Sequence, residues 1–149
     1  EFNLSTAAVS TDWLDRLVCQ YILPDQPRPG LQQRALQGML TGFMDLVCEH
    51  AGRYWVLDYK SNWLRAYGPD SLNAAVLDKR YDVQYVLYLL ALHRLLLSRL
   101  PGYDYDTHIG GAVYVFLRGI HSEGAGVHAM RPSRVLIEQL DAAFPRGLA

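Results

Sequence analysis

The chain has 149 residues, of which 50% are hydrophobic and 19% are charged, a composition typical of one folded domain rather than of a disordered segment. Its 14 Lys and Arg nearly balance its 15 Asp and Glu, which excludes a protein that coats nucleic acid through bulk positive charge. The chain shows no apolar run of membrane-spanning length, so we expect no membrane association. Cys19 and Cys48 lack CxxC spacing, which indicates a reducing, cytoplasmic setting.

Apolar periodicity and the positions of Gly and Pro predict an alternation of strands and helices. In chain order, the expected elements are a candidate edge strand (1–5), a helix (12–23), a buried strand (38–49), a strand (54–61), a short helix (70–78), a long buried helix (80–100), a strand (109–117) and a helix (132–143). The two strands on either side of residues 50–53 should form a hairpin. A hairpin followed by a helical crossover to a further strand predicts one α/β domain with a mixed β-sheet.

Two acidic residues interrupt the strands of the predicted hairpin. Asp45 and Asp58 stand in runs that otherwise read as core, and Lys60 leaves the same face of its strand as Asp58. A hairpin loop of two or four residues would place Asp45 directly opposite Asp58, with Cβ atoms roughly 5 Å apart. A three-residue loop would place the two acids on opposite faces, unless a bulge restores the pairing.

Two interpretations of these charged residues are open. In the first, Asp58 and Lys60 form a structural ion pair and Asp45 accepts a backbone hydrogen bond. In the second, the two carboxylates hold a cation, because buried carboxylates must be neutralised, paired or bound to metal. Oxygen ligands on strands suit Mg²⁺ or Mn²⁺, and Lys60 would then hold an attacking water and neutralise charge in the transition state. The three residues together favour the metal site.

The same residues resemble a known enzyme core. An apolar strand with Asp45, a hairpin and the run Asp58-Tyr59-Lys60 resemble the PD-(D/E)XK nucleases. Longer stretches resemble the C-terminal nuclease domains of the RecB family, of the exonuclease V type; they cover residues 38–47, 52–62, 81–88 and 110–119. The resemblance implies a restriction-endonuclease-like core, in which helices flank a mixed β-sheet.

The resemblance also implies a role for each matching residue. Asp45 and Asp58 would be metal ligands, with the backbone carbonyl of Tyr59 as a further ligand, and Lys60 would be the catalytic lysine. The implied cofactor is Mg²⁺, with Mn²⁺ as a substitute.

Gln84 and Tyr88 match a QxxxY motif that lies beside the active site and the DNA strand in this family. Because residues four apart share one face of a helix, the alternative is that this pair simply lines a packed helix.

The function implied is a metal-dependent exodeoxyribonuclease domain within a complex that processes DNA ends for recombination and repair. Its partners would be single-stranded DNA, a helicase portion of the same protein and further subunits. The family carries a metal-ligand His upstream of its first strand, and none of the five histidines matches that position. We therefore expect residues 1–149 to form a single nuclease-like domain, a fragment of a larger helicase–nuclease chain. The alternative is a catalytically weak or inactive docking module within the same complex.

Overall fold

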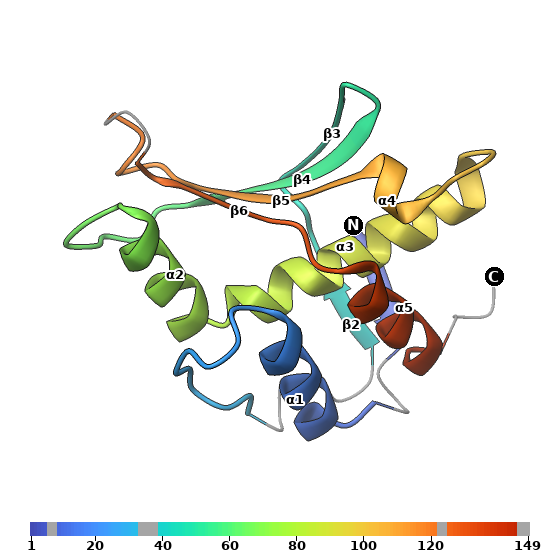
Figure 1. Cartoon of the computed structure of the whole chain (residues 1–149), viewed down its shortest axis with the longest axis horizontal. Coiled ribbons are helices and arrows are strands. Elements are labelled where there is room, and N and C mark those ends of the chain that lie inside the picture. Colours follow the sequence, from blue (N-terminus) through green and yellow to red (C-terminus); the bar gives the residue numbers. More distant parts are fainter. Residues whose placement is uncertain (6–8, 33–38, 122–124, 146–149) are drawn as a thin grey trace.

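The structure is a computed structural model that describes residues 1–5, 9–32, 39–121 and 125–145. Its elements in chain order are β1 (Phe2–Ser5), α1 (Thr11–Tyr21), β2 (Met39–Gly42), β3 (Leu46–His50), β4 (Arg53–Lys60), α2 (Pro69–Asp78), α3 (Tyr81–Arg99), α4 (Tyr105–His108), β5 (Ile109–Phe116), β6 (Val127–Met130) and α5 (Arg134–Ala143). The sheet β3-β4-β5-β6 forms one layer, and α1, α2, α3 and α5 lie on one side of it (Figure 1). None of the described helices is long and apolar enough to cross a membrane.

The sheet is mixed, as predicted. β3 is antiparallel to β4, β4 is parallel to β5, and β5 is antiparallel to β6. The parallel step requires a crossover, which α2 and α3 supply on one face of the sheet. The predicted elements therefore assemble into the expected α/β fold, with β6 as an additional edge strand that the sequence pattern did not reveal.

The hairpin between β3 and β4 has a two-residue loop. Ala51 and Gly52 both have positive φ (51° and 76°), as a type I′ turn requires, and His50 pairs with Arg53. Of the loop lengths that the sequence left open, the structure has the two-residue loop. In this register Leu46 pairs with Leu57, so Asp45 directly precedes the paired residues.

The predicted buried strand over 38–49 is wrong in two respects, and its first residue, Gly38, lies outside the described residues. The strand breaks between Gly42 and Leu46, because β2 pairs with β1 in a separate two-stranded sheet while β3 pairs with β4. β3 is an edge strand in the described chain, and Leu46 and Val47 are each 41% exposed. An apolar run is common to a buried strand and to a strand that changes sheets, so the sequence pattern did not separate the two.

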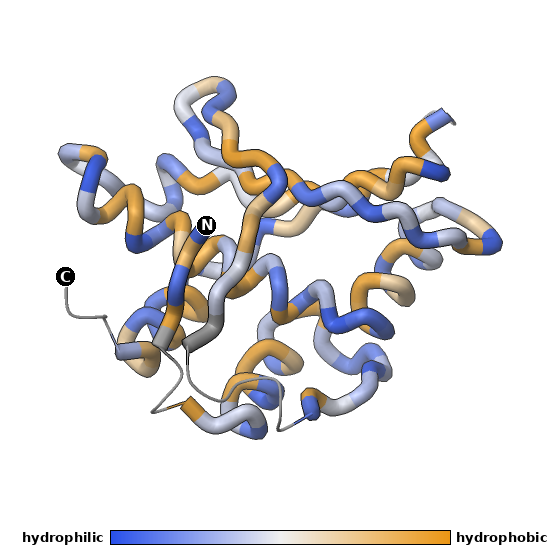
Figure 2. The backbone as a smooth tube through the Cα atoms, turned by 180° about the vertical axis from the view of Figure 1, so that it is seen from behind, coloured by the Kyte–Doolittle hydropathy of each residue, from blue (hydrophilic) through white to orange (hydrophobic). Residues whose placement is uncertain are grey.

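The core lies between α3 and the face of the sheet turned toward it. α3 is buried on most sides, as predicted, and its Val86, Leu89 and Leu90 are fully enclosed. From the sheet, Val56 and Tyr114 are also fully buried. Figure 2 shows hydrophobic segments along the strands and recurring along the helices that pack against them.

A buried ion network fixes the start of α3. Asp82 is 0% exposed and accepts hydrogen bonds from Arg28 (2.8 Å) and Arg80 (3.1 Å). Arg28 also donates to the carbonyls of Ile22 and Leu23, which directly follow α1. The network therefore joins α1, the loop after it and the first turn of α3.

Candidate active site

Asp45 lies at a bend directly before β3, one residue beyond the Leu46–Leu57 pair that ends the ladder. Its Oδ2 accepts a hydrogen bond from the backbone N–H of Tyr59 (2.9 Å). This bond draws the exposed Asp45 carboxylate to the end of β4 that carries Asp58. The hairpin thus gathers both predicted carboxylates at one end.

Asp58 and Lys60 form a close ion pair on the face of β4 that is turned toward the helices. Asp58 Oδ2 lies 2.5 Å from Lys60 Nζ, and Asp58 is 4% exposed. Burial raises the pKa of Asp58, the Lys60 ammonium lowers it in part, and the charge of Asp45 raises it further. The net effect is a pKa above the usual range, so this environment disfavours the ionised carboxylate.

Lys60 is held by side chains from α3 and β5. Its Nζ donates to Gln84 Oε1 (3.0 Å) and lies 4.0 Å from the centre of the Tyr81 ring and 5.0 Å from that of Tyr114. Gln84 Oε1 also accepts a hydrogen bond from the Tyr114 hydroxyl (2.7 Å). The ammonium group is therefore fixed in position by a carboxylate, an amide oxygen and two aromatic faces.

Tyr88, one helical turn after Gln84, fixes the backbone beside Asp45. Its hydroxyl donates to the carbonyl of Phe43 (2.8 Å). Burial, and then the charges of Asp58 and Asp45, raise the pKa of Tyr88 to about 12, so the hydroxyl remains a donor at neutral pH. Gln84 and Tyr88 thus contact the two segments that carry the predicted site residues, rather than only lining a packed helix.

Comparison with known proteins identifies the family of this chain. The sequence profile of the PD-(D/E)XK nuclease superfamily matches residues 6–148. The chain belongs to the PD-(D/E)XK nuclease superfamily. Its restriction-endonuclease-like architecture is therefore shared with that family.

The curated relatives of this PD-(D/E)XK chain include subunits named RecB of the RecBCD enzyme. The protein from Escherichia coli (strain K12) is 46% identical over 137 residues, which cover 88% of this chain and 12% of that protein. The protein from Haemophilus influenzae is 46% identical over 123 residues, which cover 79% of this chain and 10% of that protein. A protein from Mycobacterium tuberculosis is 36% identical over 131 residues, which cover 79% of this chain and 12% of that protein. The chain thus spans only a small part of the length of these relatives.

The oxygen atoms of this nuclease domain fit a hard divalent cation. Asp58 Oδ2 is buried, and the Lys60 ammonium is the polar group beside it. A second carboxylate, that of Asp45, lies at the same strand end, and oxygen donors of this kind suit Mg²⁺. The described residues form no cluster of three or more His, Cys, Asp or Glu side chains suited to a metal. Water and backbone carbonyls would therefore complete the coordination of a cation held by this pair.

The Tyr59 side chain is 46% exposed and projects from the opposite face of β4 to Asp58 and Lys60, so only its backbone borders the site. The contact of Tyr114 with Lys60 and Gln84 was not predicted, although Tyr114 occupies an inward-facing position of a clear strand. Its signal was a polar aromatic residue at a core position, because a buried Tyr hydroxyl needs a partner.

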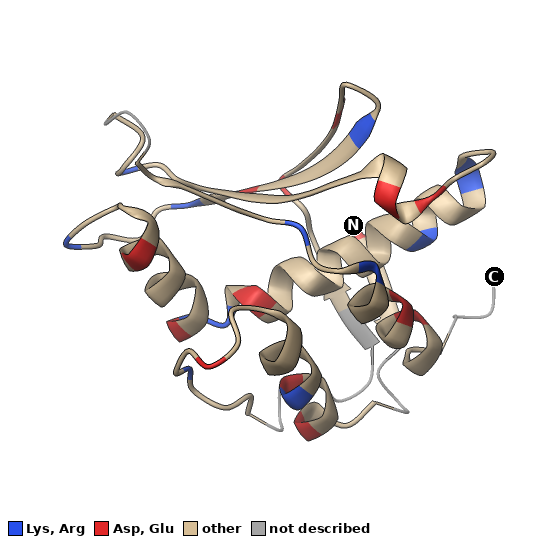
Figure 3. Cartoon of the chain, viewed as in Figure 1, with Lys and Arg blue, Asp and Glu red and all other residues tan. Residues whose placement is uncertain are grey.

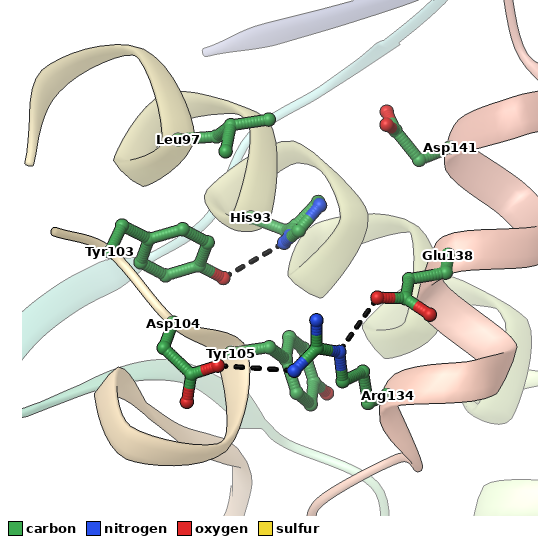
Figure 4. Close-up of a pocket in the computed structure, with 8 residues that line it drawn as sticks. All are labelled: His93, Leu97, Tyr103, Asp104, Tyr105, Arg134, Glu138 and Asp141. Atoms are coloured by element: carbon green, nitrogen blue, oxygen red, sulfur yellow. Dashed lines mark hydrogen bonds and ion pairs between the residues drawn. The ribbon is translucent and has the colours of Figure 1, made fainter.

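Two buried histidines make contacts away from the proposed site. His93 bonds the Tyr103 hydroxyl (2.8 Å), and His128, which lies on β6, is buried and bonds Asn73 (3.1 Å). His93 and Tyr103 also line a pocket of about 260 Å³ near α4 and α5, where Arg134 pairs with Asp104 and Glu138 (Figure 4). None of the nuclease motif residues lines this pocket.

Proposed function

We propose that this chain is the nuclease domain of a RecB-type subunit and acts as an exodeoxyribonuclease with Mg²⁺, or Mn²⁺ in its place. It forms a single catalytic domain within a longer helicase–nuclease chain of the cytoplasm. That longer chain delivers single-stranded DNA to it and works with partner subunits in DNA end processing and recombination repair. The observation that carries the proposal is the convergence of Asp45, Asp58 and Lys60 at one end of the hairpin.

In this mechanism, Asp45, Asp58 and the backbone carbonyl of Tyr59 hold the cation. The cation, when bound, supplies the Lewis acid that polarises a phosphodiester and acidifies a water. Lys60 orients the attacking water and neutralises the negative charge that develops on the phosphate. Gln84 keeps the Lys60 ammonium in place through its Oε1 atom, and Tyr88 keeps the backbone before Asp45 in place, so the reacting groups are preorganised.

A second candidate function is a docking module that no longer cleaves DNA. The observation that favours it is the Asp58–Lys60 ion pair at 2.5 Å, since Lys60 already supplies a counter-charge to Asp58 without any cation. In this case the chain would contribute its fold and its surface to the complex, but no chemistry.

Cleavage of single-stranded DNA by the intact natural protein that contains this chain separates the two functions. Asp58→Ala should reduce cleavage at least a hundredfold, and chelation of divalent cations should abolish it. Asp70→Ala is the matched control, because Asp70 is an exposed acid in the first turn of α2, and it should cleave as the parent does. Full cleavage by the Asp58→Ala protein would refute the nuclease site, and absence of cleavage by the parent protein would favour the docking module.

A further inference from the structure

Two aromatic residues close in sequence to the proposed site residues are more exposed than any other large hydrophobic residue in the described ranges. Trp63 is 74% exposed and Phe43 is 66% exposed. Phe43 stands two residues before Asp45, and Trp63 stands three residues after Lys60. Exposed aromatic rings at such positions suit a ligand with flat, apolar faces.

The backbone that carries each ring is fixed by a tyrosine hydroxyl. The Tyr88 hydroxyl donates to the carbonyl of Phe43 itself. The Tyr67 hydroxyl donates to the carbonyl of Asn62 (3.0 Å) and accepts from the N–H of Leu64 (3.0 Å), on either side of Trp63. Rings held on a fixed backbone lose less conformational freedom when a ligand binds, which favours binding.

Tyr67 is in turn locked against the segments that follow β5. Its carbonyl accepts a hydrogen bond from the N–H of Gly126 (3.0 Å). A Cβ atom on Gly119 would lie 2.5 Å from Tyr67 Cγ, so the ring packs directly on that glycine. The loop that presents Trp63 is thereby tied to the sheet that carries the site.

Positive charge accompanies the exposed rings. Arg118 donates its Nε to the carbonyl of Ser61 (3.0 Å), and Arg65 is exposed two residues after Trp63. Neither arginine has an ion-pair partner within the described part of the chain. Figure 3 shows basic segments at the end of β4, in the loop after it and in the turn after β5, all at one end of the sheet. Arginines free to contact phosphate beside exposed rings form the combination that binds single-stranded nucleic acid.

We propose that Phe43 and Trp63 stack on bases of the single-stranded DNA on the two sides of the phosphate that is cleaved. This inference rests on the proposed nuclease function and adds the residues that position the strand. The segments that carry the two rings diverge from the strand ends that bear the carboxylates: one turns toward β2 and the other continues toward α2 (Figure 1). The bases on either side of a phosphate held at the carboxylates would therefore meet one ring each.

The test is steady-state cleavage of a single-stranded oligonucleotide by the intact natural protein that contains this chain. Trp63→Ala and Phe43→Ala should each raise KM about tenfold, with kcat changed less than about threefold, because stacking on an aromatic ring mainly supports binding. Trp63→Phe should restore most of the loss. Leu95→Ala is the matched control, because Leu95 is a hydrophobic residue that is 51% exposed but lies on α3, outside the two loops that carry the rings. This substitution should leave both constants unchanged.

Oligonucleotides with one abasic position, moved step by step along the strand, identify stacking as the cause. For the parent, two positions should each raise KM about tenfold. At one of them the Trp63→Ala protein should show no further loss, and at the other the Phe43→Ala protein should show none. A Trp63→Ala protein with parental KM, or one whose defect adds fully to every abasic position, would overturn the inference while leaving the nuclease function intact. A parent protein that cleaves no DNA would instead overturn the proposed function and the inference together.

Discussion

The two lysines of the chain offer a matched pair of perturbations. Lys60 Nζ lies 2.5 Å from Asp58, and the two side chains are 12% and 6% exposed. Lys79 Nζ lies 3.4 Å from Asp78, and those side chains are 56% and 67% exposed. The same substitution, Lys→Ala, therefore removes one buried and one solvated ion pair from a single protein.

Removal of Lys60 leaves Asp58 buried without its counter-charge. Breaking a buried ion pair in this way costs about 3–5 kcal/mol of unfolding free energy. For a domain of this size, that loss corresponds to a fall in Tm of about 6–20 °C. Removal of Lys79 should change the unfolding free energy by less than about 1 kcal/mol, since exposed pairs contribute little.

Thermal and urea unfolding with a chelator present, and again with Mg²⁺, measure both effects. Because a bound cation supplies the charge that Lys60 provided, we expect Mg²⁺ to stabilise the Lys60→Ala protein more than the parent or the Lys79→Ala protein. DNA cleavage by the Lys60→Ala protein should nevertheless fall about 10²–10³-fold, since the cation does not replace the group that orients the water. Equal unfolding free energies for the two variants, or cleavage at the parental rate, would refute this reasoning.

Two further predictions concern the ion network at the start of α3. Asp82→Asn should lower the unfolding free energy by about 3–5 kcal/mol, because it leaves the buried Arg28 without its carboxylate partner. Asp78→Asn at an exposed position should change it by less than about 0.5 kcal/mol, and urea titration compares the two. Burial favours a higher pKa for Asp15, but the hydrogen bonds from Arg80 and from the Leu31 N–H outweigh it and lower that pKa below its usual range. The stability lost in Asp15→Asn should therefore be full at pH 7 and vanish as the pH falls through the native pKa, which unfolding at several pH values measures.

Much of the site followed from local sequence because its parts are close together in the chain. A two-residue loop ending in Gly52 sets the hairpin register, and that register brings Asp45 to the strand end that carries Asp58. Lys60 shares a face with Asp58 by the period of a strand alone. These relations need no information beyond the hairpin.

The unpredicted features depend on contacts between distant segments. The break before Asp45 arises because β2 pairs with β1, which is formed by the first residues of the chain. Lys60 is fixed by Gln84 and Tyr114, which come from α3 and β5 and meet only when the sheet and helix pack. β6 escaped prediction because four residues are too few for a clear alternation, although they bury His128.

Asp45 and Asp58 are proposed to hold a divalent cation, and calorimetric titration with Mn²⁺ and Mg²⁺ tests this assignment most directly. The parent chain should bind one ion at this site, and both Asp58→Ala and Asp45→Ala should weaken binding at least tenfold, while Asp70→Ala binds as the parent does. Parental affinity in both the Asp58→Ala and the Asp45→Ala proteins would contradict the assignment of the metal site.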